Sequence, residues 1–181
     1  ALEYCNEVIQ THPFVIVEEK LEGEEFSLQC LTDGKTVVAT PPVQDHKRAF
    51  VGDIGANTGG MGSYSCEDHL LPFLTKKDVE NGLQMTQKVA EAIYKETGQF
   101  YKGVMYAGLI VTKNGVKLLE YNARFGDPEA MNVLPLMETD FIDICNAIIN
   151  QELHNTKIKF QNNATVCKYL VPNGYPDNPA K

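Results

Sequence analysis

Three polar side chains near residue 120 have the types and spacing that suit a cation beside a phosphate. Glu120, Asn122 and Arg124 alternate along a segment that begins with two leucines. Because successive side chains of a β-strand point to opposite faces, Glu120 and Asn122 should point the same way, and Arg124 should join them if the strand continues. Carboxylate and amide oxygens suit Mg²⁺, and arginine can hold a phosphate or carboxylate through two parallel hydrogen bonds. Taken alone, the pattern is more typical of the solvated face of an antiparallel strand.

A second candidate site follows a β-branched run near the start of the chain. Residues 14–19 are predicted to form a strand, and five glutamates fall within residues 18–25. Backbone N–H and C=O groups give directional partners for the edge of a purine base, and carboxylates can accept hydrogen bonds from its amino group and ribose hydroxyls. Composition alone favours a simpler interpretation, an exposed acidic turn.

The third candidate combines basic residues with glycine-rich backbone. Residues 44–48 read Gln-Asp-His-Lys-Arg, and residues 55–62 contain four glycines. Such backbone next to lysine and arginine can form an anion cradle. The segment has neither the GxxxxGK[ST] pattern of a P-loop nor the strand and helix context of a dinucleotide-binding fingerprint. From these residues alone, a flexible loop remains open.

Composition sets limits on partners and setting. The chain has 181 residues, 43% of them hydrophobic, and a formal net charge of −8, which fits one domain and disfavours binding to nucleic acid. No apolar run approaches the ~20 residues of a membrane span. Five scattered cysteines without a CxxC pair suggest neither a disulfide framework nor a zinc site, and the four histidines lack metal-ligand spacing. A cytoplasmic protein without nucleic-acid or membrane partners is expected.

The elements that should position these residues are two hairpins and two long helices, which predicts an α+β fold. Residues 41–66 have no apolar period and are predicted to be irregular. An Asn114-Gly115 pair between apolar runs predicts a type I′ turn. The remaining expected elements are a helix end within 1–10, a hairpin of 25–31 with 35–40, a helix over 75–97 capped by Thr75 and ended by Gly98, a hairpin of 104–112 with 116–122, a helix over 140–151 and a strand over 164–171.

Taken together, these segments resemble the signatures of the glycinamide ribonucleotide synthetases, which are ATP-grasp enzymes. The resemblance covers about residues 14–151 and 164–176, and is carried in order by Gln44–Arg48, by Asn57–Tyr64, by Tyr106–Leu109 and by Glu120–Glu129. It implies the C-terminal lobe of an ATP-grasp domain, with an antiparallel sheet and flanking helices. The implied division is an ATP-grasp portion over 1–153, a linker over 154–163 and the start of a C-terminal domain over 164–181.

The resemblance also implies a reaction and roles for residues. The reaction is the ATP-dependent ligation of glycine to 5-phosphoribosylamine through glycyl phosphate, in purine biosynthesis. ATP and Mg²⁺, or Mn²⁺, are the implied cofactors. The implied residues are Glu18, Glu19, Lys20 and Leu21 at the adenine, Glu25 at the ribose, Glu120 and Asn122 at the metal, Arg124 at the transferring phosphoryl group, and Asp45, Lys47, Asn57, Thr58, Gly59, Gly60, Met61, Gly62 and Asp127 around the two substrates.

Two departures from the family pattern lead to further expectations. Residues 108–111 carry no carboxylate where many ATP-grasp enzymes have one, so the metal site should depend on Glu120 and Asn122. The family enzymes are longer, so the chain is expected to be a piece that lacks the N-terminal and phosphate-covering lobes and is inactive alone. Three alternatives stay open: another ATP-grasp carboxylate–amine ligase or carboxylase lobe, a non-catalytic nucleotide-binding module, and a plain structural domain.

Overall fold

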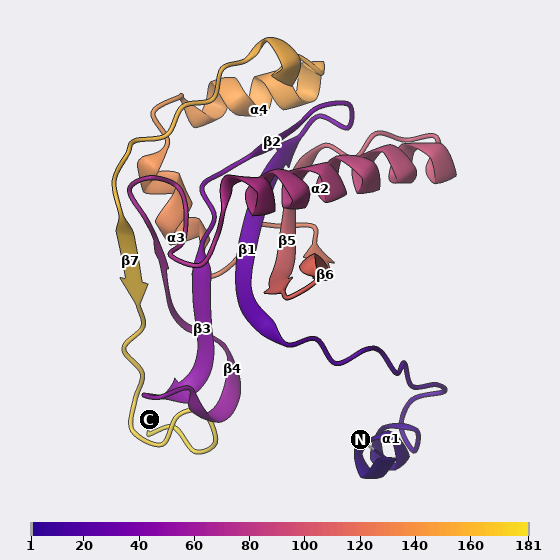
Figure 1. The fold of residues 1–181 in the computed structure, drawn as a ribbon, viewed down its shortest axis with the longest axis vertical. Helices are drawn as coiled ribbons and strands as arrows, with labels where there is room; N and C mark the ends of the chain where they lie inside the picture. Colours follow the sequence, from indigo (N-terminus) through magenta and orange to yellow (C-terminus); the bar gives the residue numbers. More distant parts are fainter. Residues whose placement is uncertain (1, 181) are drawn as a thin grey trace.

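The computed structural model describes residues 2–180 as two antiparallel sheets with the later helices packed against them, whereas the N-terminal helix lies apart from both sheets (Figure 1). The four-stranded sheet has the order β2-β1-β5-β6, and the three-stranded sheet has the order β3-β4-β7. The antiparallel pairing confirms the predicted α+β class. The elements are α1 (Leu2–Val8), β1 (Gly23–Thr32), β2 (Val37–Ala39), β3 (Gln44–Phe50), β4 (Ile54–Ser65), α2 (Lys76–Thr97), β5 (Gly103–Thr112), β6 (Gly115–Asn122), α3 (Ala130–Val133), α4 (Phe141–Asn150) and β7 (Thr165–Lys168), with 3₁₀ turns over Leu134–Leu136 and Leu153–Asn155.

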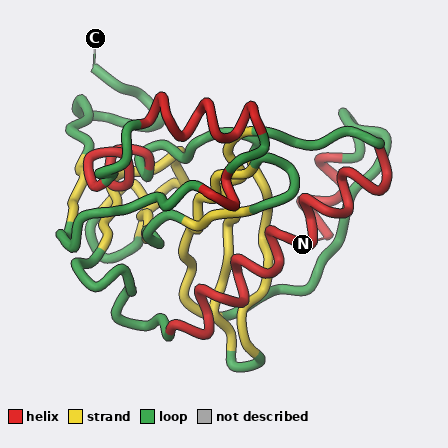
Figure 2. The backbone as a smooth tube through the Cα atoms, turned by 90° about the horizontal axis from the view of Figure 1, so that it is seen from above, coloured by secondary structure: helices red, strands yellow, loops and turns green. Residues whose placement is uncertain are grey.

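Strand β1 is buried on both faces, and this organises the core. Phe26, Leu28 and Cys30 pack with α2, whereas Leu31 packs with Ile144 and its neighbours on α4. The alternation of a strand sends successive side chains to these two sides. Figure 2 accordingly shows the strands lying between long helices. The four-stranded sheet is therefore a rigid support for residues at its ends.

The long helix α2 begins and ends where the sequence predicts. Thr75 and Asp78 form a reciprocal capping box at its start, and Gly98 ends it with a left-handed φ of 71°. Asp140 caps α4 through hydrogen bonds from the backbone of the first turn. Among residues 2–180, no helix combines the length and apolar character that a membrane crossing requires.

The prediction that residues 41–66 are irregular is wrong, because most of this segment forms the β3–β4 hairpin. Its strands carry polar residues on both faces, so the apolar period that usually reveals a strand is missing. Glycine also serves strand pairing here: a Cβ on Gly62 would lie 2.7 Å from the carbonyl oxygen of Cys167, on the neighbouring strand β7. The two sheets meet next to this hairpin, where Ser27 and Val43 exchange backbone hydrogen bonds of 2.8 and 3.0 Å.

Three further details differ from expectation. Residues 14–19 are not a strand: in the described chain no neighbouring strand pairs with them, and Phe14, Ile16 and Val17 are 69–81% exposed. In the second hairpin Gly115 takes the positive φ of 96° and pairs with Thr112, so the turn is not type I′, which needs positive φ at both central residues. The last strand is shorter than predicted, spanning Thr165–Lys168. The division at residues 153 and 163 stays a prediction.

Candidate functional site

A polar pocket of about 160 Å³ lies where β1, β3, β5 and β6 meet. We call it the central pocket. Glu25, Asp45, Lys47 and Glu120, which come from three predicted groups, all line it, together with Tyr106. The bridge between Ser27 and Val43 brings the start of β3 to β1, which explains why residues twenty positions apart in sequence share one cavity.

Lys47 is the electrostatic centre of this pocket. Its Nζ lies 3.2 Å from Asp45 Oδ2 and 3.5 Å from Glu25 Oε2, and the Asp45 side chain is only 5% exposed. Burial acts to lower the pKa of Lys47, but the two carboxylates outweigh it and the pKa is raised. Lys47 therefore carries its charge at neutral pH, beside the carboxylates of Asp45 and Glu25.

Glu120 and Asn122 point to the same side, as predicted, because Asn122 Nδ2 donates a 3.0 Å hydrogen bond to Glu120 Oε1. Leu119 is the extra residue of a β-bulge, since Leu118 pairs with Leu109 and Glu120 with Gly108. The partner strand β5 carries no second carboxylate. A Cβ on Gly108 would come within 3.3 Å of Glu120 Cγ, so there is little room for a side chain at this position.

This pair fits a hard cation that keeps other ligands. The described residues contain no group of three or more His, Cys, Asp or Glu able to hold a metal by themselves. Mg²⁺ typically takes one or two protein carboxylates or amides and completes its shell with water and phosphate oxygens. The donor set of Glu120 and Asn122 matches that mode and does not match a closed structural metal site.

Arg124 does not continue the strand. β6 ends at Asn122, and the exposed Arg124 donates a 2.8 Å hydrogen bond from Nη1 to the carbonyl oxygen of Phe125. It lies on the turn between β6 and α3, two residues beyond Asn122. The structure thus keeps Arg124 near this end of the sheet but not in line with Glu120 and Asn122.

A second cavity, of about 310 Å³, joins Gly59, Gly60 and Asp127 with Tyr169. We call it the Asp127 pocket. The Tyr169 hydroxyl donates a hydrogen bond to Asp127 Oδ1, which raises the pKa of Tyr169 to about 12. A Cβ on Gly60 would lie 2.7 Å from Pro128 Cδ, so the β4 backbone approaches this turn as closely as only glycine permits.

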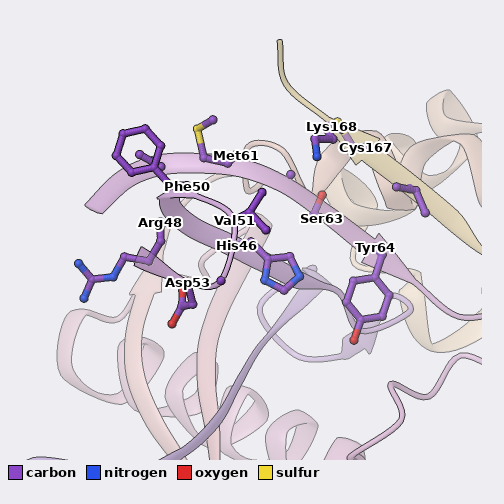
Figure 3. A pocket seen from close by; sticks show the side chains of 14 residues that line it. His46, Arg48, Phe50, Val51, Asp53, Met61, Ser63, Tyr64, Cys167 and Lys168 are labelled. Carbon is purple, nitrogen blue, oxygen red and sulfur yellow. The ribbon is translucent and has the colours of Figure 1, made fainter. Parts of the chain in front are cut away.

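The third cavity, of about 470 Å³, is lined by the alternate side chains of β3 (Figure 3). His46 and Arg48 line this outer pocket with Met61 and Gly62, while Asp45 and Lys47 line the central pocket. The His46 ring stacks on Tyr64 with centroids 6.1 Å apart. The structure therefore divides the predicted substrate residues other than Asn57 and Thr58 among three cavities.

Asn57 and Thr58 have structural contacts within the hairpin. Asn57 is paired with Arg48, and Thr58 Oγ1 donates a 2.8 Å hydrogen bond to the carbonyl oxygen of Lys47. The Thr58 hydroxyl also accepts a 3.1 Å hydrogen bond from the Gly60 N–H. Thr58 thus ties the backbone of Lys47 in the central pocket to that of Gly60 in the Asp127 pocket.

The predicted adenine segment over residues 18–21 lines none of these three pockets, and neither do Asn57, Thr58, Asn122 and Arg124. Glu18, Glu19 and Lys20 are exposed on irregular chain before β1, and Leu21 is half-buried. In residues 2–180, Glu25 is the member of this group that lines the central pocket. Lys20 pairs with Glu22 at 3.6 Å, but both side chains are more than four-fifths exposed, so the pair contributes little.

Sequence reasoning missed three residues that the structure places next to predicted ones. Tyr106 lines the central pocket, Tyr169 lines the Asp127 pocket, and Glu129, two residues after Asp127, is 2% exposed. Tyr106 and Glu129 lie in segments that carried the family resemblance, and that was the signal available for them. Tyr169 gave no signal, because it follows a short, half-exposed strand.

Comparison with known proteins places these features in one family. Residues 1–130 match the family described as phosphoribosylglycinamide synthetase, ATP-grasp (A) domain. The phosphoribosylamine–glycine ligase of Methanocella arvoryzae is 52% identical over 181 residues, covering 100% of this chain and 42% of that protein. That of Methanocaldococcus jannaschii is 50% identical over 184 residues, covering 100% of this chain and 41% of its own length. The chain thus spans about two fifths of the length of these curated relatives.

Solved structures agree. The crystal structure of phosphoribosylamine–glycine ligase from Thermotoga maritima matches with a TM-score of 0.74 and 31% identity, over 90% of this chain and 40% of that one. The biotin carboxylase domain of the Hydrogenobacter thermophilus 2-oxoglutarate carboxylase matches with a TM-score of 0.58 and 16% identity, over 91% of this chain and 34% of that one, which shows the shared fold alone. With most of its length matched by the family, the chain belongs to the phosphoribosylglycinamide synthetases and carries sequence of their ATP-grasp (A) domain.

Proposed function

We propose that the full-length protein containing this chain ligates glycine to 5-phosphoribosylamine with cleavage of ATP to ADP and phosphate. The observation that carries the proposal is the 50–52% identity to phosphoribosylamine–glycine ligases across the whole chain. The polar central pocket supports it, because it gathers residues from three of the segments that resemble this family. A reducing, cytosolic setting belongs to the same proposal and is supported by the free thiols of the cysteines.

The central pocket is the proposed site of the nucleotide and its metal. Glu25 would accept hydrogen bonds from the ribose, and Glu18, Glu19, Lys20 and Leu21 would adjoin the adenine. Glu120 and Asn122 would hold Mg²⁺, or Mn²⁺, which when bound supplies positive charge beside the phosphates. Lys47 adds a fixed cation in the same cavity, because Asp45 and Glu25 keep it charged.

The reaction needs positioning and charge neutralisation more than covalent help from the protein. A carboxylate oxygen of glycine attacks the γ-phosphorus, and the bond to the leaving oxygen of ADP breaks. The amine of 5-phosphoribosylamine then attacks the acyl carbon of glycyl phosphate, and phosphate and a proton leave. Arg124 is the proposed contact of the transferring group, since its guanidinium can hold phosphate and carboxylate oxygens through paired hydrogen bonds.

The substrates are proposed to occupy the space bordered by Asp45, Lys47, the 57–62 segment and Asp127. An acyl phosphate must be shielded from water, because hydrolysis competes with attack by the amine. The described pockets lie on a chain about two fifths the length of its relatives. We therefore propose that N-terminal and phosphate-covering lobes complete the site and that the 181-residue chain alone is inactive.

ADP release by the full-length protein tests this function. Release should require glycine and 5-phosphoribosylamine together, and bicarbonate should not replace glycine. Arg124→Ala should abolish ligation while ATP still binds, and Arg124→Lys should restore it poorly because lysine lacks the planar fork. Bicarbonate-dependent release would identify a carboxylase, ATP binding without ligation would identify a non-catalytic module, and no ATP affinity would leave a structural domain.

A further inference from the structure

Three buried polar side chains lie beneath the turn that carries Arg124 and Asp127, and the proposed chemistry assigns them no role. Gln29, Tyr106 and Glu129 are 1%, 7% and 2% exposed. They come from β1, from β5 and from the residue preceding α3. Buried polar groups are expensive unless they are hydrogen-bonded, so their contacts indicate why they are there.

The three side chains meet the turn from two sides. Gln29 and Tyr106 are direct cross-strand partners, so both project from the same face of the sheet. Gln29 Oε1 accepts a 2.7 Å hydrogen bond from the backbone N–H of Gly126, and the Tyr106 hydroxyl donates a 2.8 Å hydrogen bond to Glu129 Oε1. Each bond joins the sheet to the loop segment that follows β6.

Gly126 fits closely between these groups. A Cβ at this position would lie 2.6 Å from Glu129 Oε2 and 2.7 Å from Tyr106 Cε2. The backbone of the turn therefore rests directly on the carboxylate and on the ring. Gly126 is held by the hydrogen bond that its N–H donates to Gln29 and by close packing against its Cα.

The amide of Gln29 is oriented so that its oxygen accepts from the turn, although this leaves its NH₂ group without a partner. Its Nε2 has no hydrogen-bond partner within the described structure, although the atom is buried. Reversing the amide would place the NH₂ group against the Gly126 N–H and lose the 2.7 Å bond. A buried donor left unpaired destabilises a fold, so this arrangement favours a position of the turn at a cost in stability.

The same residues connect the two cavities. Tyr106 lines the central pocket with Glu120, and its hydroxyl reaches Glu129, two residues after Asp127. Arg124 lies two residues before Gly126 and Asp127 directly after it, so a shift of this glycine moves both. The backbone of Ala130 also donates a 2.9 Å hydrogen bond to the Gly126 carbonyl oxygen, which ties the turn to the start of α3.

We infer that Gln29, Tyr106 and Glu129 form a buried clamp on Gly126 that positions Arg124 and Asp127 relative to the central pocket. They are positioning residues, because the hydrogen bonds that define the clamp go to the turn and to each other. The kinetic part of this inference rests on the proposed function. The structural part, that the clamp holds Gly126, does not.

The clamp is tested in the full-length protein by two readouts. Gln29→Leu removes the acceptor of the Gly126 N–H, so hydrogen exchange at that amide should rise at least tenfold. Tyr106→Phe should lower kcat by on the order of tenfold, because a small misplacement of a reacting group is costly, while KM for ATP stays within twofold. Glu129→Gln keeps a side-chain oxygen as acceptor and should retain most of the activity that Glu129→Leu loses.

Thr75→Ala is the matched control, because it weakens the fold at the far cap of α2 without touching the turn. Unchanged exchange at Gly126 in Gln29→Leu would overturn the clamp whatever the activity. Equal losses of kcat in Thr75→Ala and Tyr106→Phe at equal thermal midpoints would reduce it to a general stabilising role and overturn the positioning inference. If wild-type protein releases no ADP with glycine, the proposed function fails, and the exchange measurement still decides whether the clamp holds Gly126.

Discussion

Replacing Gly126 with alanine adds one methyl group at the tightest point of the turn between β6 and α3. The added Cβ would lie 2.6 Å from Glu129 Oε2, 2.7 Å from Tyr106 Cε2 and 2.8 Å from Glu129 Cδ. Both neighbours are buried, and they are fixed to each other by a 2.8 Å hydrogen bond. Neither is the free end of an exposed side chain, so neither can move aside without breaking another contact.

The size of the effect follows from these distances. Ordinary contacts between non-bonded carbon atoms are about 3.5–4.0 Å, so the carboxylate, the ring or the turn must shift by roughly 1 Å. Overfilling a packed interior in this way costs about 1–3 kcal/mol. A domain of about the length of this chain loses about 2–4 °C of thermal midpoint for each kcal/mol of destabilisation, so a fall of several degrees is expected.

Thermal and urea unfolding of the full-length protein measures this cost, with Gly59→Ala as the control. A Cβ on Gly59 would meet no atom within 4 Å, so that variant should stay within about 0.5 kcal/mol of wild type although it also lies beside the Asp127 pocket. Equal stability of the two alanine variants would refute the close packing of Gly126 on Glu129 and Tyr106. A loss confined to Gly126→Ala, accompanied by lower ligase activity, supports it.

The remaining predictions concern a helix cap, a thiol and a buried carboxyl. Thr75→Ala removes the capping box with Asp78 and should destabilise the protein by about 1 kcal/mol in urea unfolding, whereas the exposed Lys77→Ala should change little. Burial raises the pKa of the Cys30 thiol to about 12, so iodoacetamide at pH 8 should modify Cys30 only after unfolding, as peptide mass mapping would reveal. Burial also raises the pKa of Glu129 above its ordinary value of 4.5, so the folded protein favours the protonated carboxyl. The free energy of folding that this protonation contributes is fully present below pH 4.5 and is lost as the pH rises through the raised pKa. The free energy of unfolding of wild type relative to Glu129→Gln should therefore fall as the pH rises from 4.5 through the raised pKa. A difference that does not change with pH would show that the carboxyl is not desolvated.

Elements with strong local signals could be predicted from the sequence. The capping box at Thr75 and the left-handed Gly98 fix the ends of α2 through groups within a few residues of each other. The turn of the predicted hairpin of 25–31 with 35–40 likewise closes by local hydrogen bonds, from the N–H groups of Lys35 and Thr36 to Asp33 Oδ1. Such contacts do not depend on the rest of the fold, so the residues at the ends of these elements identify them.

Elements that depend on a distant partner could not be predicted. The run over residues 14–19 has strand propensity, but propensity needs a neighbouring strand and a buried face to take effect. The β3–β4 hairpin is the opposite case: its apolar period is absent, yet pairing with β7 and the contact between Ser27 and Val43 hold it in place. In both cases the deciding interaction lies far away in sequence.

The site shows the same limit at the level of single side chains. Residues 44–48 read as one basic and acidic cluster, but the strand sends Asp45 and Lys47 to the central pocket and His46 and Arg48 to the outer one. The alternation is predictable once the segment is known to be a strand; without that, its charges cannot be assigned to one cavity or the other. Lys47 and Arg48 are therefore separable in function. Neutralising Lys47 leaves the Asp45 carboxylate, which is only 5% exposed, without its ion-pair partner in the central pocket. Neutralising Arg48 removes only a 3.0 Å hydrogen bond to the Gly55 carbonyl oxygen on the other face. The adjacent cations of this segment belong to two different surfaces of one sheet, and only Lys47 has its charge fixed by the carboxylates around the proposed nucleotide site.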